Sequence, residues 1–126
     1  SMIRDLSLDY PDFLIASSEW FAFVPAKEYF DEPGDHADEL ETSVMMHYHP
    51  ELVNLDEAGD GNYKKFASQM LNEKVAWIPR NWQNVSQDTG IGNPKKASAE
   101  KGKKYAEAVV AKYALLFEEL VHKELY

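Results

Sequence analysis

The segment from Gly34 to Pro50 concentrates the side chains of this chain that could carry out chemistry. A turn signal at its start leads into Asp35 and His36, and three further carboxylates follow by position 41. An imidazole can exchange protons near neutral pH, and imidazoles and carboxylates together are ligands for divalent metals. Four acids and one histidine within seven residues exceed what helix capping needs. Two interpretations follow: a capped helix with a solvated acidic end, or a functional cluster.

A helix that begins in this segment would position these side chains. Leu40, Val44 and His47 recur at helical spacing and predict one buried face. Asp35 is the expected N-cap, because its carboxylate can accept hydrogen bonds from the first free amides of a helix. Glu41 lies about 100° around the helix from Leu40 and therefore borders the buried face. A carboxylate there needs a partner, such as a metal ion, an arginine or a group of hydrogen-bond donors.

Two sequence motifs connect this segment with a known family. Residues 35–46 read D-H-A-D-E-L-E-T-S-V-M-M, and residues 50–53 read P-E-L-V. Residues 90–102 contain G-I-G-N-P and then A-S-A-E-K-G. This order resembles the creatininase (creatinine amidohydrolase) family, whose members carry H-A-G-E-x-E-T-S-x-M-L with P-E-L-V, and later G-V-x-G-D-P-x-x-A-T-x-E-K-G. The resemblance covers roughly residues 12–120.

The resemblance implies a two-metal hydrolase, commonly with zinc or manganese, that opens a cyclic amide or cleaves another small C–N bond. A metal-bound water becomes hydroxide near neutral pH, and a metal polarises the carbonyl group. His36 matches the motif histidine and is the candidate for passing a proton to the leaving nitrogen. Glu41 matches the glutamate of E-T-S and would ligate a metal or hydrogen-bond a ligand. Asp35 would orient His36 or the substrate, and Trp20 stands where relatives keep a substrate-stacking tryptophan.

Each candidate also has a structural alternative. His36 could simply hydrogen-bond at the start of the helix, and Glu41 could accept a hydrogen bond from the preceding loop. Trp20 could be a core or rim aromatic residue. His47 and His49 resemble a metal pair, but residues two apart on a helix point in different directions. We therefore interpret this pair as core or surface histidines.

The chain departs from the family pattern at three places. Asp38 replaces the small glycine of H-A-G, and Asn93 replaces the aspartate of G-D-P. Residues 31–33 occupy the place where creatinine-cleaving members have a tryptophan. The last departure argues against creatinine itself as the substrate and leaves formamides, lactams and other small amides open.

Composition limits the class of protein. The chain has 126 residues, of which 44% are hydrophobic, and is large enough for one domain with a core of its own. A net charge of -9 argues against nucleic acid as a partner. We expect the lysines of residues 95–104 to form a solvated face. No apolar run approaches the roughly 20 residues of a membrane span. The lack of cysteine excludes disulfides and thiolate chemistry and is compatible with the cytoplasm.

The apolar segment at residues 13–17 is the best candidate for a strand. It is apolar on both faces and runs into the aromatic residues 20–23, and a helical tail at residues 2–10 precedes it. A second short strand is expected at residues 75–78. This order favours the fold that the resemblance implies, a three-layer α/β/α arrangement with a mostly parallel sheet.

The last predicted helix, at residues 97–123, has the clearest pattern, with Ser98 as its N-cap. Shorter helical pieces are expected at residues 50–55 and 63–72. The apolar stripe of the last helix consists of Tyr105, Val109, Tyr113, Leu116 and Leu120.

Two strands rarely form a stable sheet alone. We therefore expect residues 1–126 to be the C-terminal portion of a single creatininase-like domain. Relatives carry an E-x-H motif, a nearby aspartate and a G-H-x-x-N motif in their first half, and the E-x-H and G-H-x-x-N motifs do not occur in this chain. We expect this N-terminal metal-binding half to come from a missing segment or a second chain, and activity to require it.

The leading hypothesis is thus a metal-dependent amidohydrolase of creatininase type with a small amide substrate. The alternative is a non-catalytic assembly or regulatory subunit that keeps the fold without a complete metal site. An unrelated acidic helical interaction module rests on charge alone. By resemblance, we also expect a cytoplasmic homo-oligomer, such as a hexamer.

Overall fold

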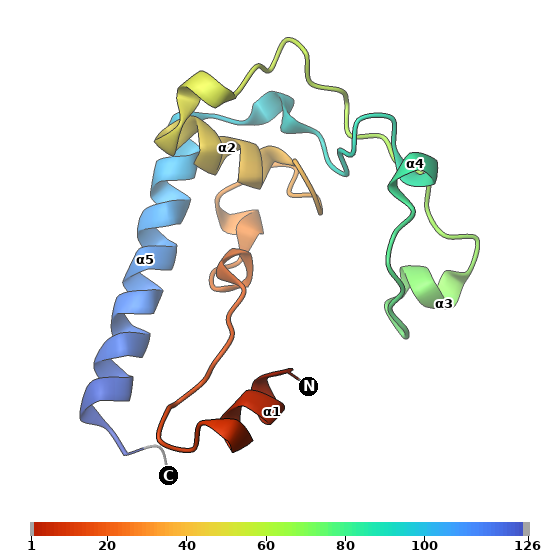
Figure 1. The fold of residues 1–126 in the computed structure, drawn as a ribbon. Helices are drawn as coiled ribbons and strands as arrows, with labels where there is room; N and C mark the ends of the chain where they lie inside the picture. The colour runs from red at the N-terminus through yellow and green to blue at the C-terminus, as the bar shows by residue number, and fades with distance from the viewer. Residues whose placement is uncertain (1, 125–126) are drawn as a thin grey trace.

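A computed structural model describes residues 2–124 as an open arrangement of helices and long connections (Figure 1). In these residues no β-strand is present, and an isolated antiparallel bridge joins His36 to Ile91. The helical elements are α1 (Met2–Asp9), η1 (Trp20–Ala22), η2 (Ala26–Glu28), α2 (Glu39–Tyr48), η3 (Pro50–Leu52), α3 (Gln69–Asn72), α4 (Trp82–Val85), η4 (Pro94–Lys96) and α5 (Ala99–His122).

The body of the molecule is the crossing of α2 over the first turns of α5 (Figure 1). Gly102 allows this crossing, because a Cβ at that position would fall on the carbonyl oxygen of Ser43 in α2. Ser98 caps α5 as predicted, with its side chain accepting a hydrogen bond from the amide of Lys101. Beside the crossing lies the buried core, which consists of Phe30, Leu40, Tyr105 and Val109.

The start of α2 corrects one prediction. Asp38, and not Asp35, is its N-cap, and the Asp38 carboxylate accepts hydrogen bonds from the amides of Glu41 at 2.9 Å and Gly34 at 2.5 Å. The helix begins at Glu39 because Ala37 has a φ of 49°, in the left-handed region, which a right-handed helix cannot include. His36 therefore lies on the loop before the helix.

The strands predicted at residues 13–17 and 75–78 are not formed in the described chain. Residues 14–19 have no regular structure, and the aromatic stretch after them forms the short helix η1. An apolar strand needs a neighbouring strand to pair its backbone, and residues 2–124 provide none. The parallel sheet consequently stays a prediction.

Residues 62–88 form an arm that extends away from α2 and α5 and carries α3 and α4 (Figure 1). The predicted helix at residues 63–72 is shortened to the single turn of α3. The two sides of the arm are joined where the amide of Lys64 donates to the carbonyl of Val85 at 2.7 Å. Within residues 2–124, no helix combines the length and the apolar character that crossing a membrane requires.

Candidate active site

The loop that carries His36 is held by the glycine-rich segment around Ile91. The amide of His36 donates to the carbonyl of Ile91 at 3.1 Å, and the amide of Ile91 donates back to the carbonyl of His36 at 2.8 Å. Gly34 packs so closely here that a Cβ would clash with Ile91 and Gly92. The two motifs recognised in the sequence are therefore neighbours in space.

The side chains of His36 and Glu41 lie together at the head of α2. Nδ1 of His36 is 3.7 Å from Oε2 of Glu41, and the two side chains are 45% and 39% exposed. This separation suits an ion pair when the imidazole is protonated but exceeds a hydrogen bond. The same Glu41 oxygen accepts a hydrogen bond from the amide of Ala37 at 2.6 Å. Glu41 thus accepts the hydrogen bond from the preceding loop that a purely structural role predicts, and it also lies near His36.

Trp82 also contacts the imidazole, which could not be predicted from the sequence. The ring centroids of His36 and Trp82 are 5.0 Å apart. The guanidinium group of Arg80 lies 5.5 Å from the Trp82 ring and donates to the Asp35 carboxylate at 2.5 Å. Asp35 is thus paired with a cation from the arm. No pattern in the sequence links residue 35 with residue 80, because the two meet only through the tertiary fold.

An open cavity of about 590 Å³ lies beside α2. Trp20 and Glu41 both line it, whereas neither Asp35 nor His36 does. Trp20 also packs edge-on against Tyr105, with ring centroids 6.1 Å apart. Glu41 is thus close to His36 and shares the cavity wall with Trp20. Asp88 and Glu57, which the sequence analysis did not single out, add two further acids to the cavity wall.

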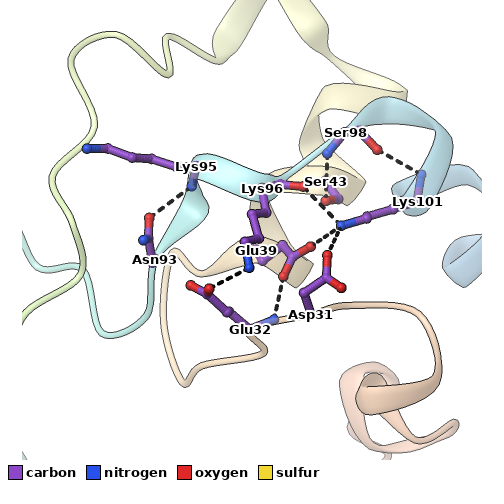
Figure 2. Close-up of polar contacts among 9 residues, drawn as sticks. All are labelled: Asp31, Glu32, Glu39, Ser43, Asn93, Lys95, Lys96, Ser98 and Lys101. Atoms are coloured by element: carbon purple, nitrogen blue, oxygen red, sulfur yellow. Dashed lines mark hydrogen bonds and ion pairs between the residues drawn. The ribbon is translucent and has the colours of Figure 1, made fainter.

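Glu39 anchors a charged network behind this loop (Figure 2). Its side chain is fully buried, and both carboxylate oxygens are bonded. Oε1 accepts from Nζ of Lys101 at 2.5 Å, and Oε2 accepts from the amide of Glu32 at 2.7 Å. Lys101 also donates to Asp31 at 2.7 Å and to the carbonyl of Lys96 at 3.2 Å. The network ties the loop before His36 to the first turns of α2 and α5.

Lys95, Lys103 and Lys104 are exposed, as the predicted solvated face requires, but this network makes Lys101 an exception. The side chain of Lys101 is only 29% exposed. Its hydrogen bonds to Asp31 and then to Glu39 raise the pKa of Lys101 above its usual 10.5. Lys101 in turn holds the pKa of Asp31 below its usual 3.8. Lys96 follows the prediction only in part, since half of its side chain is exposed while it pairs with Glu32 at 2.7 Å.

The serine of the E-T-S triplet has a structural role. Ser43 is fully buried, and its Oγ accepts a hydrogen bond from the amide of Ser98 at 3.1 Å. It thereby fixes the N-cap of α5 against α2.

The described residues do not form a complete metal site by themselves. Among residues 2–124, no three histidine, cysteine, aspartate or glutamate side chains group closely enough to hold a metal ion. His36 and Glu41 are a single pair, and Asp35 is engaged by Arg80. The donor set of the described chain therefore does not fit a metal by itself.

Comparisons with known proteins agree with the motifs. The family described as creatininase, creatinine amidohydrolase, matches residues 2–117. A crystal structure of a provisionally named creatinine amidohydrolase from Bacteroides fragilis is 61% identical, with a TM-score of 0.92. The match covers 99% of this chain and 50% of that chain, so this chain spans half the length of that relative. No protein in the curated set matches.

Proposed function

The chain belongs to the creatininase family, and we propose that it forms part of a metal-dependent hydrolase that opens a small cyclic amide or cleaves another non-peptide C–N bond. The observation that carries this proposal is the pairing of His36 with Glu41 beside a cavity that Glu41 and Trp20 line. His36 does not line the cavity itself, but its imidazole is 45% exposed and lies 3.7 Å from Glu41, which does, so a substrate held at Glu41 would lie near it.

His36 is the proposed proton carrier. The Ile91 bridge fixes its backbone, and its side chain is 45% exposed, in contact with Trp82 and near Glu41 at Nδ1. A histidine in such a position can protonate the nitrogen that leaves when a C–N bond breaks. Asp35 is proposed to keep the arm over this site through Arg80, or to bind the substrate when Arg80 moves away.

Trp20 and Glu41 are the proposed contacts on the cavity side. The indole of Trp20 offers an aromatic face for a flat amide or cyclic urea, and a planar ring of that size fits the available space. Glu41 would ligate a metal or orient one of its ligands. Since residues 2–124 lack a complete ligand group, the other ligands would come from the N-terminal half of a creatininase-like domain, supplied by a missing segment or by a second chain. Zinc or manganese, two ions per complete site, is the proposed metal content.

The lack of a ligand group in the described residues favours a second candidate, a non-catalytic assembly subunit of the same family. Elemental analysis of the complete assembly, purified without chelators, separates the two. Two equivalents of zinc or manganese per site, with hydrolysis lost on dialysis against a chelator, support the enzyme. An assembly that binds neither metal supports the subunit.

The role of His36 is tested in the complete assembly with a panel of lactams, cyclic ureas and formamides. His36→Ala should lower kcat by about 100-fold or more, the usual contribution of a general acid, while leaving the circular dichroism spectrum unchanged. His122→Ala, at the end of α5, is the matched control and should retain full turnover. Unchanged turnover in His36→Ala would remove His36 from the reaction.

A further inference from the structure

The main chain of His36 is fixed, but its ring has no hydrogen bond that sets its orientation. The two hydrogen bonds with Ile91 hold the backbone of residue 36. Nδ1 lies 3.7 Å from Oε2 of Glu41, and within residues 2–124 the ring makes no hydrogen bond. A fixed main chain still leaves a side chain free to choose among rotamers. A group that delivers a proton has to be held within about 0.5 Å and 10–20° of its productive geometry.

Trp82 supplies the contact that can hold the ring. The centroid of its ring lies 5.0 Å from that of His36, with 47° between the two ring planes. Aromatic rings at this separation attract one another, and the large indole also blocks the space that it occupies. The imidazole therefore cannot turn to the side of Trp82 unless the indole moves.

Arg80 in turn holds the indole in place. Its guanidinium group lies 5.5 Å from the Trp82 ring, within the range of a cation–π contact, and donates to the Asp35 carboxylate at 2.5 Å. Asp35 and His36 are consecutive residues of the site loop. Two neighbours of the loop are thus held by two residues of the arm, and the arm residues also contact each other. Moving the indole away from His36 requires that this closed set of contacts be broken.

The backbone of the arm presents Trp82 at this place. Trp82 begins α4, which is joined to the other side of the arm by the hydrogen bond from Lys64 to Val85. Gly61 and Thr89, the residues on either side of the arm, have φ angles of 71° and 66°, in the left-handed region. That conformation is rare for a β-branched residue such as Thr89, and backbone outliers of this kind cluster at functional sites. The arm therefore leaves the body through two sharp turns that aim it at the site loop.

We propose that Trp82 is a positioning residue for His36 and that Arg80 keeps its indole in place. Trp82 takes and gives no proton. It limits the imidazole to the orientation from which the proton can reach the leaving nitrogen. The inference rests on the proposed function in treating His36 as the proton carrier, but the orientation of the ring can be measured without any hydrolysis.

The first test measures kcat and KM in the complete assembly with the panel of lactams, cyclic ureas and formamides. Trp82→Ala should lower kcat by about 10–100-fold and change KM by less than about 2-fold, because a misplaced proton donor affects the transition state and not substrate binding. Trp82→Phe keeps an aromatic ring and should recover most of kcat. Trp77→Ala removes an exposed tryptophan of the same arm and should retain full turnover. A loss confined to KM, or equal losses in Trp82→Phe and Trp82→Ala, would overturn the inference.

The second test measures the rotamer of His36 by NMR in the same assembly with labelled histidine. Its signal is assigned by its loss in His36→Gln. One rotamer is expected in wild type, Trp82→Phe and Trp77→Ala, and an average of several rotamers in Trp82→Ala. Arg80→Gln, which leaves the indole intact, should show a smaller degree of averaging and serves if Trp82→Ala does not fold. A single rotamer in Trp82→Ala, or in Arg80→Gln if that variant is the one that folds, refutes positioning by Trp82. Absence of hydrolysis in every variant and in wild type, together with the expected rotamers, would refute the proposed function and leave the positioning role standing.

Discussion

At the scale of single residues, Glu39 is the most constrained acid of the candidate site. It stands beside the N-cap of α2, where a carboxylate suits the helix dipole, and its complete burial makes a positive partner necessary. Lys101 supplies that partner from α5, and the amide of Glu32 satisfies the other oxygen. Glu39 therefore joins α2, α5 and the segment at Glu32, and the loop that carries His36 follows Glu32 directly.

Removing Lys101 should leave the Glu39 carboxylate buried and unpaired. We expect Lys101→Met to lower the free energy of unfolding by about 3 kcal/mol, the lower end for a broken buried pair, since Lys101 is partly exposed. Adding Glu39→Gln should restore part of this loss, because glutamine can still accept from the amide of Glu32. Lys104→Met breaks an exposed pair with Glu100 on the same helix and should have a much smaller effect. Equal losses in the two lysine variants, measured by urea unfolding, would contradict this account.

The same network predicts an alkaline limit to stability. The folded-state pKa of Lys101 lies above its unfolded value of 10.5, so its contribution is complete below that pH and is lost as pH rises through the folded pKa. Burial also raises the pKa of Tyr105 above 10.0, which acts in the same direction. We expect the unfolding free energy to fall above about pH 10, and to fall less steeply in Lys101→Met and in Tyr105→Phe. Urea titrations across the alkaline range measure these slopes, and wild-type slopes in both variants would refute the assignment.

At the scale of elements, prediction succeeded where local signals decide the structure. Ser98 as N-cap and the regular apolar stripe were sufficient to predict α5, because capping and periodicity are properties of neighbouring residues. The start of α2 was placed three residues early, because Asp35 and Asp38 are both good caps. Only the backbone of Ala37 decides between them. Lys101 was expected in solvent because its partners lie about 60 and 70 residues earlier in the chain.

Gly102 offers a test in which two local effects oppose each other. Alanine is the better helix former by about 1 kcal/mol, so propensity alone predicts that Gly102→Ala stabilises α5. A Cβ at this position would meet the backbone of Ser43, so we expect a net loss of about 1–3 kcal/mol as α2 is displaced. Urea unfolding gives the sign. The reverse change at an exposed position, Ala111→Gly, should cost only the propensity difference, and stabilisation by Gly102→Ala would show that the crossing is looser than described.

At the scale of the whole molecule, the sequence predicted a sheet that residues 2–124 do not form. The apolar pattern of residues 13–17 predicts a buried strand, but Phe13 and Leu14 are exposed in the structure, because pairing requires strands that residues 2–124 do not supply. In the candidate site too, contacts between neighbours in the sequence could be predicted, and contacts between distant segments could not. His36 and Glu41 share one helix start, so their proximity followed from spacing, whereas Trp82 and Arg80 reach the site from the arm and could not be inferred locally.

The arm, residues 62–88, should behave as a unit that opens separately from the body. It meets the site loop through the Arg80 to Asp35 pair and the contact of Trp82 with His36, and both lie near the surface. Partly exposed pairs contribute about 1 kcal/mol or less, so Arg80→Gln should leave the global unfolding free energy nearly unchanged. Arg80→Gln should nevertheless open the arm more often than in wild type. Hydrogen exchange in the arm and chymotrypsin cleavage at Trp77 should therefore become faster, while exchange in α2 and α5 should not change.

Lys64→Gln removes a charge from the same arm without breaking an ion pair and should behave as wild type. Because Trp82 moves with the arm, we also expect the His36 ring signals to shift in Arg80→Gln, and unchanged signals with unchanged cleavage would show that Arg80 does not hold the arm to the site.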